Sequence, residues 1–473
     1  MARVETVGWL AIATVAWSVL AFGGVYPWAY WPLIGISALT GGLGLLASRR
    51  GALSASERLP HAFLLGVVAI VLAVAVQLIP LRQSVLATLS PATDSFLRQH
   101  DLVYALVRAA DVAVPGWTGH PVSLSPAATA RSLAFLVSFA LLSVGLTASL
   151  ASGGLRALVE RVTVLAVVVA MAGIIQQATV TTGKVYGFWT PEQTGSIYGP
   201  FVNKNHFAGW MVMALALTIG LASGRIARGM QGVKAGWRNR VLWISSPSAS
   251  RLAITAFSAL VMGVALALTL SRSGLTAFAA AILIAAWAVA KRQTTWHRRT
   301  VAIAYMMFVF VMALGWAGVD VVARRFVGPW QTVGGRLGIW QDALRMASDF
   351  RLTGVGINAF GEAMLDYQTT ALDLHFDAAH NDWLQLAAEG GLLVGIPVLV
   401  AFILLVREIA RRFHERQDDT MTYFIRTGAV IGLVAMGVQE FFDFSLQIPG
   451  NAVLFAVLAA IAIHKAATRQ TPS

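Results

Sequence analysis

The sequence predicts an all-α membrane protein, a bundle of about twelve transmembrane helices with both termini in the cytoplasm and one long, partly helical outer loop. Of its 473 residues, 57% are hydrophobic and only 12% are charged, too little charge to cover a soluble domain of this length. Apolar runs of about 18 residues or more recur along the chain, and each can cross ~30 Å of hydrocarbon as a helix. Barrel strands would be shorter and would alternate polar with apolar residues, so helices are the expected spanning elements.

Each apolar run is interpreted as one span. The first run has no clear small-x-small cleavage site and is followed directly by another, so we interpret it as a retained helix and not as a signal peptide. The second and sixth runs are short or rich in glycine. The predicted spans cover residues 7–25, 29–47, 60–80, 130–150, 158–179, 205–223, 252–270, 274–290, 300–319, 383–406, 422–441 and 449–464.

Basic residues predict the orientation of the bundle. They concentrate in every second connection, where they are expected to face the cytoplasm. The net charge of +13 therefore indicates topology and not nucleic-acid binding, and the absence of cysteine excludes disulfides and thiolate metal sites. The basic residues of these connections are Arg49, Arg50, Arg58, Arg156, Arg161, Arg225, Arg228, Lys234, Arg238, Arg240, Arg251, Lys291, Arg292, Arg298, Arg299, Arg407, Arg411, Arg412, Arg416, Lys465 and Arg469.

Three outer segments, 81–128, 180–204 and 320–382, are too long to be turns. They are rich in Trp, Tyr, Phe and Leu beside charged residues, a composition that indicates folded and not disordered loops. In the last segment Leu337, Trp340, Ala343, Leu344 and Ala347 recur at helical spacing, which predicts an amphipathic helix lying on the bundle. We expect two parts: N-terminal transmembrane helices over 1–190, and a core over 191–465 that contains this loop.

The richest polar stretch lies in the 320–382 segment. Arg336 follows two glycines and would open a helix at the membrane surface, where a guanidinium can hold two oxygens of a phosphate. His380 stands just before a span whose first turn Asn381 or Asp382 can cap, and an imidazole with a pKa of ~6.5 can accept a proton near neutral pH. The alternative interpretation is structural, with an Arg that reaches lipid headgroups and a His that caps a helix.

Two further stretches place cations beside polar groups at the outer face. Arg272 lies in the tight connection Ser271-Arg272-Ser273-Gly274, where a guanidinium is costly unless it faces protein, water or an anion. Lys204, Asn205 and His206 open the sixth span, and a helix N-terminus favours anions. Snorkelling to headgroups and helix capping are the alternatives for these residues.

Acidic residues in the same regions allow several interpretations. Glu389, within the tenth span, and Glu440 and Asp443, near the outer end of the eleventh, are candidate partners for the arginines or orienters of His380. The spacing Asp373-x-His375-x-Asp377 resembles metal ligands, but no second cluster completes a coordination shell, so we expect no metal site.

In order and spacing, these motifs make the chain similar to the O-antigen ligase and polymerase superfamily. The resemblance covers residues from about 195 to 460, and the first 190 residues contribute helices without motifs. It rests on Phe201–Gly209, Ser271–Gly274, Arg336 with Trp340, Gly354-x-Gly356, His380-Asn381 with Leu384, Gln385, Glu389, Gly390 and Gly391, and Asp443–Pro449 with Asn451.

The resemblance implies an inverting glycosyltransferase that takes a glycan from a polyprenyl diphosphate at the periplasmic face of the inner membrane. By residue-to-residue match it implies His380 as base and Arg272 and Arg336 as ligands of the diphosphate. Lys204, Asn205, His206, Arg345, Asn381 and Glu389 are the candidate substrate-binding residues. Lys204 stands where relatives frequently have Arg. The lysine keeps the positive charge but lacks the forked guanidinium that can bind two oxygens at once. No metal or other cofactor is implied.

The acceptor stays open between a second glycan, as in polysaccharide polymerisation, and lipid A-core, as in ligation. The Asn-Lys-Asn-His stretch and the Asp443–Pro449 ending favour the exopolysaccharide or O-antigen branch over protein glycosylation. A membrane transporter or lipid-linked glycan flippase is the alternative, and it would have paired broken helices near the bilayer midplane and short loops. In a non-catalytic membrane scaffold, the clustered Arg and His would be incidental.

Overall fold

The computed structural model describes residues 2–48, 59–110, 119–150, 152–179, 183–191, 196–231, 245–292, 331–370, 374–415 and 419–465. Within these ranges the regular elements are helices, and strand pairing is limited to three isolated bridges. The predicted all-α class is confirmed. The predicted span 300–319 and residues 320–330 of the outer loop lie outside the described residues.

Within the described ranges, seven helices are long and apolar enough to cross a membrane, so the chain is a multi-pass membrane protein. They are α2 (Pro27–Ser48), α8 (Pro126–Ser149), α9 (Ser152–Thr179), α10 (Lys204–Gly229), α12 (Pro247–Leu268), α18 (Asp382–His414) and α19 (Thr420–Gln439). Shorter apolar helices occupy four further predicted spans: α1 (Ala2–Leu20), α4 (His61–Val76), α13 (Arg272–Arg292) and α20 (Pro449–Ile463). A total of twelve spans stays a prediction.

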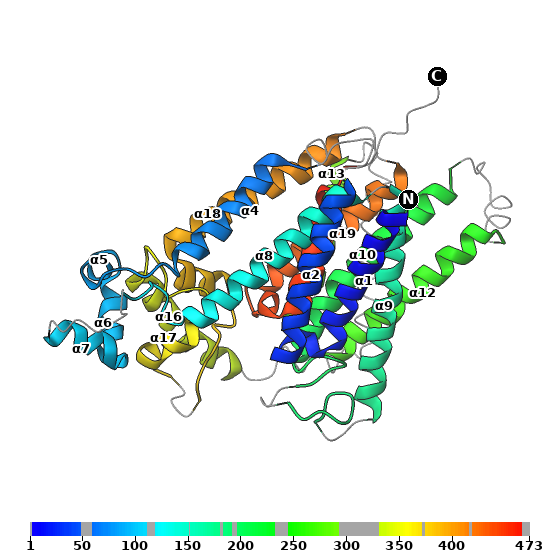
Figure 1. The fold of residues 1–473 in the computed structure, drawn as a ribbon. Coiled ribbons are helices and arrows are strands. Elements are labelled where there is room, and N and C mark those ends of the chain that lie inside the picture. Colours follow the sequence, from blue (N-terminus) through cyan, green and yellow to red (C-terminus); the bar gives the residue numbers. More distant parts are fainter. Residues whose placement is uncertain are drawn as a thin grey trace.

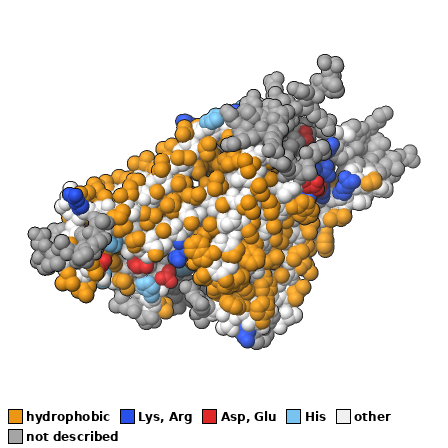
Figure 2. Space-filling view, in the orientation of Figure 1, with side chains coloured by type: hydrophobic (Ala, Val, Ile, Leu, Met, Phe, Trp, Pro, Cys, Tyr) orange, Lys and Arg blue, Asp and Glu red, His pale blue; other side chains and the backbone are white. Residues whose placement is uncertain are grey.

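Helix α10 forms the centre of the bundle. It packs against α9, α12, α13, α19 and α20, and most of its side chains are buried by protein. Small residues allow the closest approach, because Gly220 on α10 and Gly428 on α19 leave room for the two backbones to touch. Helices α4 and α18 run side by side at the edge of the bundle (Figure 1). Hydrophobic side chains cover the broad middle of the surface in Figure 2.

The two ends of the bundle differ in charge. At one end the guanidinium of Arg426 donates to the His464 carbonyl at 2.7 Å, and Arg225 pairs with Glu160 at 2.5 Å. We call this the basic end. The other end holds the first turns of α10 and α20, where Gly23 of η1 (Phe22–Gly24) lies against Phe201 and Ile448. We call it the site end.

An outer lobe extends beyond one end of α4 and α18 (Figure 1). It consists of α5 (Gln83–Leu89), α6 (Pro91–His100), α7 (Leu102–Ala110), α16 (Gln331–Asp349) and α17 (Phe360–Tyr367). Helix α16 confirms the predicted helix, but its apolar face is only partly as predicted, because Ala343 is buried whereas Leu337 and Leu344 are 49% and 58% exposed. Its buried face and α17 share a hydrophobic cluster with Phe96 and with Ala379, the residue before His380. The lobe is therefore packed as one unit with the segment that leads into α18.

Helix α18 is broken at Gly391, whose φ of 53° and ψ of −155° interrupt the helical hydrogen bonds. The loop after α16 supplies the missing partners. Val355 and Gly356 donate to the carbonyls of Ala388 and Glu389, and Leu392 donates to the Arg351 carbonyl at 2.8 Å. Gln77, after α4, adds bonds to the carbonyls of Thr353 and Glu389 at 2.8 and 2.9 Å. Because these backbone groups are satisfied by protein, the break is a fixed joint between lobe and bundle.

The contact between α2 and α8 gives a test of the packing. A Cβ at Gly41 would overlap the carbonyl of Leu141, whereas a Cβ at Gly42 would meet nothing within 4 Å. We expect Gly41→Ala to lower the free energy of unfolding in detergent by about 1–3 kcal/mol, the usual cost of overpacking. Gly42→Ala is the matched control and should unfold like the wild type. Equal stability of the two variants in a denaturant titration would contradict this packing.

Candidate active site

His380 is held in a strained conformation just before α18. Its φ of 53° lies in the left-handed region, which non-glycine residues rarely adopt. The neighbouring backbone is fixed on both sides. Trp340 of α16 donates to the Ala379 carbonyl at 3.0 Å, and the Asn381 side chain caps α18 by accepting from the Leu384 N–H at 3.1 Å. These contacts fix where the imidazole points.

Phe444 joins His380 to His206. Both imidazoles pack edge-on against this ring, with centroid distances of 4.9 and 4.8 Å. Asp443 is fully buried beside them, and its Oδ1 lies 3.8 Å from Nε2 of His206. Nε2 of His206 and Nδ1 of His380 are buried and have no hydrogen-bond partner among the described residues. Two imidazoles and one carboxylate therefore share a small space at the site end.

The first turn of α10 is tied to the loop that contains Arg272. Ser271 Oγ donates to Oδ1 of Asn205 at 2.8 Å, and Ser273 Oγ lies 3.5 Å from Oδ2 of Asp443. Arg272, between these serines, is half-buried and begins α13. Its backbone is thus placed at the edge of the His206–Asp443 cluster.

Arg336 reaches the same cluster from α16. Its Nη1 donates to the Phe442 carbonyl at 3.0 Å, two residues before Phe444. One carbonyl uses one of five guanidinium N–H groups, so the others stay available to an anion. The structure thus brings His380, His206 and Arg336 together around residues 442–444, and it places Arg272 in the adjoining loop.

Comparison with protein families decides what this arrangement belongs to. Residues 257–403, which include Arg272, Arg336 and His380, match the family model of the O-antigen ligases. This match supports the resemblance to the O-antigen ligase and polymerase superfamily. No curated protein matches the chain closely enough to count as a relative. The matched family suggests a glycosyltransferase-like enzyme that acts on glycan-lipid substrates in a membrane.

Burial and charge set the protonation of the site around His380. Burial, together with the positive charge of Arg336, lowers the pKa of His380 to about 4. The negative charge of Asp443 acts in the opposite direction. At neutral pH the imidazole is therefore uncharged and able to accept a proton. Burial also raises the pKa of Glu440 well above its ordinary value, and repulsion from Asp382 and Asp443 raises it as well.

Other candidate residues lie elsewhere or serve the scaffold. Arg345 pairs with Asp342 and contacts Thr369 Oγ1 at 3.2 Å, which holds the end of α17. Buried Glu389 accepts from the backbone N–H groups of Asn358 and Phe360 at 2.8 and 3.2 Å. Among the described residues, Glu389 is hydrogen-bonded to this loop and to Gln385, and not to Arg272 or Arg336. Lys204 starts α10, and its backbone N–H donates to the Ser196 carbonyl at 2.7 Å.

A metal site is not assembled in the described part of the chain. No group of three or more His, Cys, Asp or Glu there is arranged to hold an ion. Asp373 lies outside the described residues, while His375 and Asp377 approach within 3.3 Å of each other on the exposed surface of the outer lobe.

Three residues complete the site although the sequence did not single them out for it. Phe444 separates the imidazoles, and Gln439 connects the Asn205 carbonyl to Ser445 Oγ, both at 3.0 Å. Gln385 accepts from the Ala379 N–H at 2.9 Å and so supports His380. Gln385 and Phe444 belong to the His380–Gly391 and Asp443–Pro449 motifs, whereas Gln439 lies outside both. A bridging role depends on contacts between distant segments, so the sequence does not reveal it.

Proposed function

We propose that this protein transfers a glycan from a polyprenyl diphosphate carrier to a hydroxyl acceptor at the periplasmic face of the bacterial inner membrane. The acceptor is a second glycan or lipid A-core. The observation that carries the proposal is the convergence of His380 and Arg336 on residues 442–444, with Arg272 in the adjoining loop. An uncharged imidazole beside a guanidinium suits a base next to a diphosphate.

The orientation of the bundle supports the periplasmic assignment. Arg156, Arg225, Arg412 and Arg426 gather at the basic end, and cytoplasmic connections of membrane proteins carry the excess of Arg and Lys. The site end is opposite, since α10 runs from Lys204 at the site end to Gly229 at the basic end. Both termini and the basic connections would then be cytoplasmic and the outer lobe periplasmic.

The proposed reaction is a direct displacement. The acceptor oxygen attacks the anomeric carbon, the bond from that carbon to the diphosphate oxygen breaks, and the diphosphate leaves with the electron pair. His380 takes the acceptor proton. Arg336 and Arg272 stabilise the growing negative charge, an effect of about 3–4 kcal/mol for one well-placed donor. Attack from the side opposite the leaving group inverts the anomeric configuration.

Asp443 and His206 support the base in this proposal. When His380 becomes imidazolium, the buried carboxylate of Asp443 offsets its charge, as the aspartate of a catalytic triad does for its histidine. His206 lies between Asp443 and Phe444 and keeps both in place. Asp443 and His206 are therefore proposed as positioning residues and not as the base.

The pH dependence of kcat/KM tests the state of His380. Because its pKa is about 4 and the neutral form is the base, activity should be full at pH 7 and should fall as pH drops toward 4. The acid limb of kcat should lie at higher pH, since a bound diphosphate offsets the charge of Arg336 that lowers the pKa. Initial rates over pH 4–8 measure both limbs. An acid limb of kcat/KM near pH 6.5 would contradict this, because it would indicate an imidazole whose pKa is not lowered by burial and Arg336.

The transporter alternative finds less support. A transporter uses unwound helices to line a ligand site near the midplane. The break in α18 is instead filled by residues 351–356 of the protein itself. We found no observation that favours the flippase or the scaffold over transfer.

Transfer by the purified protein tests the proposal and separates the two acceptors. A polyprenyl diphosphate-linked repeat unit is offered with lipid A-core or with a second lipid-linked repeat unit. Product with lipid A-core identifies a ligase, and product with the repeat unit identifies a polymerase. Absence of product with both acceptors would contradict the proposal.

A further inference from the structure

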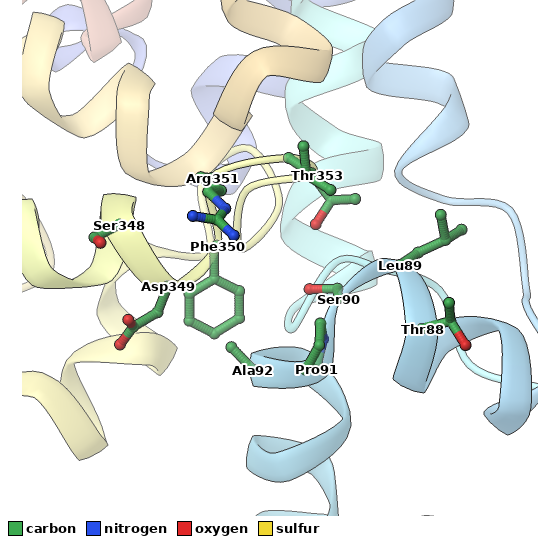
Figure 3. Close-up of a pocket in the computed structure, with 11 residues that line it drawn as sticks. Thr88, Leu89, Ser90, Pro91, Ala92, Ser348, Asp349, Phe350, Arg351 and Thr353 are labelled. Atoms are coloured by element: carbon green, nitrogen blue, oxygen red, sulfur yellow. The ribbon is translucent and has the colours of Figure 1, made fainter.

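A second site is suggested by a pocket of about 490 Å³ on the outer lobe, away from the residues assigned above (Figure 3). One wall comes from the end of α5 and the start of α6, and the other from the end of α16 and the loop that follows it. The lining residues are Thr88, Leu89, Ser90, Pro91, Ala92, Ser348, Asp349, Phe350, Arg351, Leu352 and Thr353. Its size falls in the range of small-molecule sites, about 300–1,000 Å³.

The polar groups of the pocket suit a carbohydrate. Hydroxyls of Thr88, Ser348 and Thr353 can both donate and accept hydrogen bonds, Asp349 only accepts and Arg351 only donates. Figure 3 shows the Phe350 ring between Asp349 and Ala92 of the first turn of α6. Sugar hydroxyls also donate and accept, so they match this mixture. A site for a simple anion would not place a carboxylate beside its only arginine in the lining.

The pocket is fixed relative to the proposed active site. Helix α16 carries Arg336 near its start and Asp349 at its end, and 13 residues at 1.5 Å each separate them by roughly 20 Å. Phe350 belongs to the same hydrophobic cluster as Ala379, next to His380. The backbone of Arg351–Gly356 is bonded to the break in α18. A chain of several sugars that starts at His380 would span this separation.

We propose that this pocket binds a distal sugar of the glycan chain whose first sugar reacts at His380. The proposal rests on the proposed function and adds to it a second contact with the glycan. It accounts for the rigid connection between lobe and site, because a distal contact positions the reacting sugar only when both sites belong to one body. Long glycans would then be better substrates than short ones.

Filling the pocket tests the proposal. Ser348 is exposed and lines the pocket, so a Trp at this position would occupy it without disturbing the core. Leu344, one turn earlier on α16 and 58% exposed, does not line it, which makes Leu344→Trp the matched control. Transfer is measured with lipid diphosphate carrying one complete repeat unit and with the same carrier carrying one sugar. Ser348→Trp should raise KM about tenfold for the complete unit and leave the single-sugar substrate unchanged.

Varying donor and acceptor length separately shows which glycan the pocket holds. If Ser348→Trp raises KM only when the donor is long, the pocket binds the donor chain; if only when the acceptor is long, it binds the acceptor. Arg351→Ala should follow Ser348→Trp in either case. Equal effects of Ser348→Trp on long and short substrates would overturn the proposal. So would a defect seen only in anionic-lipid vesicles, which would indicate a lipid headgroup instead.

Direct binding separates this proposal from the transfer reaction. The soluble repeat-unit oligosaccharide, released from its carrier, is added to purified protein and followed by saturation-transfer NMR. The wild type and Leu344→Trp should give a signal that Ser348→Trp loses. If Ser348→Trp gave the same signal as the wild type, the assignment of the pocket as a sugar site would be wrong even if transfer is observed. Failure of the wild type to transfer, with this difference intact, would count against the proposed function alone.

Discussion

His380→Ala is expected to lower glycan transfer by about 10²–10⁴-fold, the usual contribution of a positioned base. The imidazole is uncharged at neutral pH because burial and Arg336 lower its pKa to about 4, so it can take the acceptor proton without first losing one. Alanine removes the only proton acceptor at this position and leaves the helices untouched. Transfer from a lipid-linked repeat unit, measured with protein of equal purity and melting temperature, tests the expectation.

Backbone strain at position 380 calls for a second variant. Asn adopts positive φ more readily than Ala, so His380→Asn keeps the left-handed turn and lacks the base. Both variants should be inactive, while His375→Ala, on the exposed surface of the outer lobe, should behave as the wild type. Cells that make full-length polymer with His380→Asn would show that another group accepts the proton.

Arg336→Lys is expected to lower kcat by about 10²–10³-fold, although it keeps the positive charge. The guanidinium donates one N–H to the Phe442 carbonyl and can direct a pair of others to two oxygens of a diphosphate. The lysine side chain is shorter and ends in a single ammonium group, so it cannot bind the Phe442 carbonyl and two diphosphate oxygens at the same time. Single-turnover rates with saturating donor measure the loss.

The control for charge and length is Arg98→Lys, on α6 of the outer lobe, where the arginine pairs with Asp94. It should retain wild-type rates. If Arg336→Lys also retained them, the fork would be dispensable, and Arg336 would serve only to hold residues 442–444.

The helices could be predicted because their cause is local. A run of apolar residues must form a helix in a bilayer, and eleven predicted spans correspond to helices at nearly the same residues. The spacing of Leu337, Trp340 and Leu344 likewise predicts α16. The boundaries were less predictable, since α18 continues to His414, well beyond the predicted end at 406, where charged side chains keep it helical at the basic end.

The site could be predicted only in its chemistry. His380, Arg336 and His206 were recognised from residue type and motif, and the structure brings them to one place. Phe444 as the ring between two imidazoles could not be foreseen, nor could the loop 351–356 that completes the broken α18. Both depend on contacts between segments far apart in the chain. For the same reason, the sequence leaves Glu389 as a possible partner of arginine, whereas its described bonds are to Asn358, Phe360 and Gln385.

The most direct test of the account is the stereochemistry of transfer by the purified wild type. A polyprenyl diphosphate-linked glycan of known anomeric configuration is converted with acceptor, and NMR of the product reports the new linkage while released polyprenyl diphosphate is quantified. Direct displacement with His380 as base and Arg336 on the leaving group predicts inverted linkage and one diphosphate released per bond formed. Retention of configuration, which a single direct displacement at the anomeric carbon cannot produce, would contradict it.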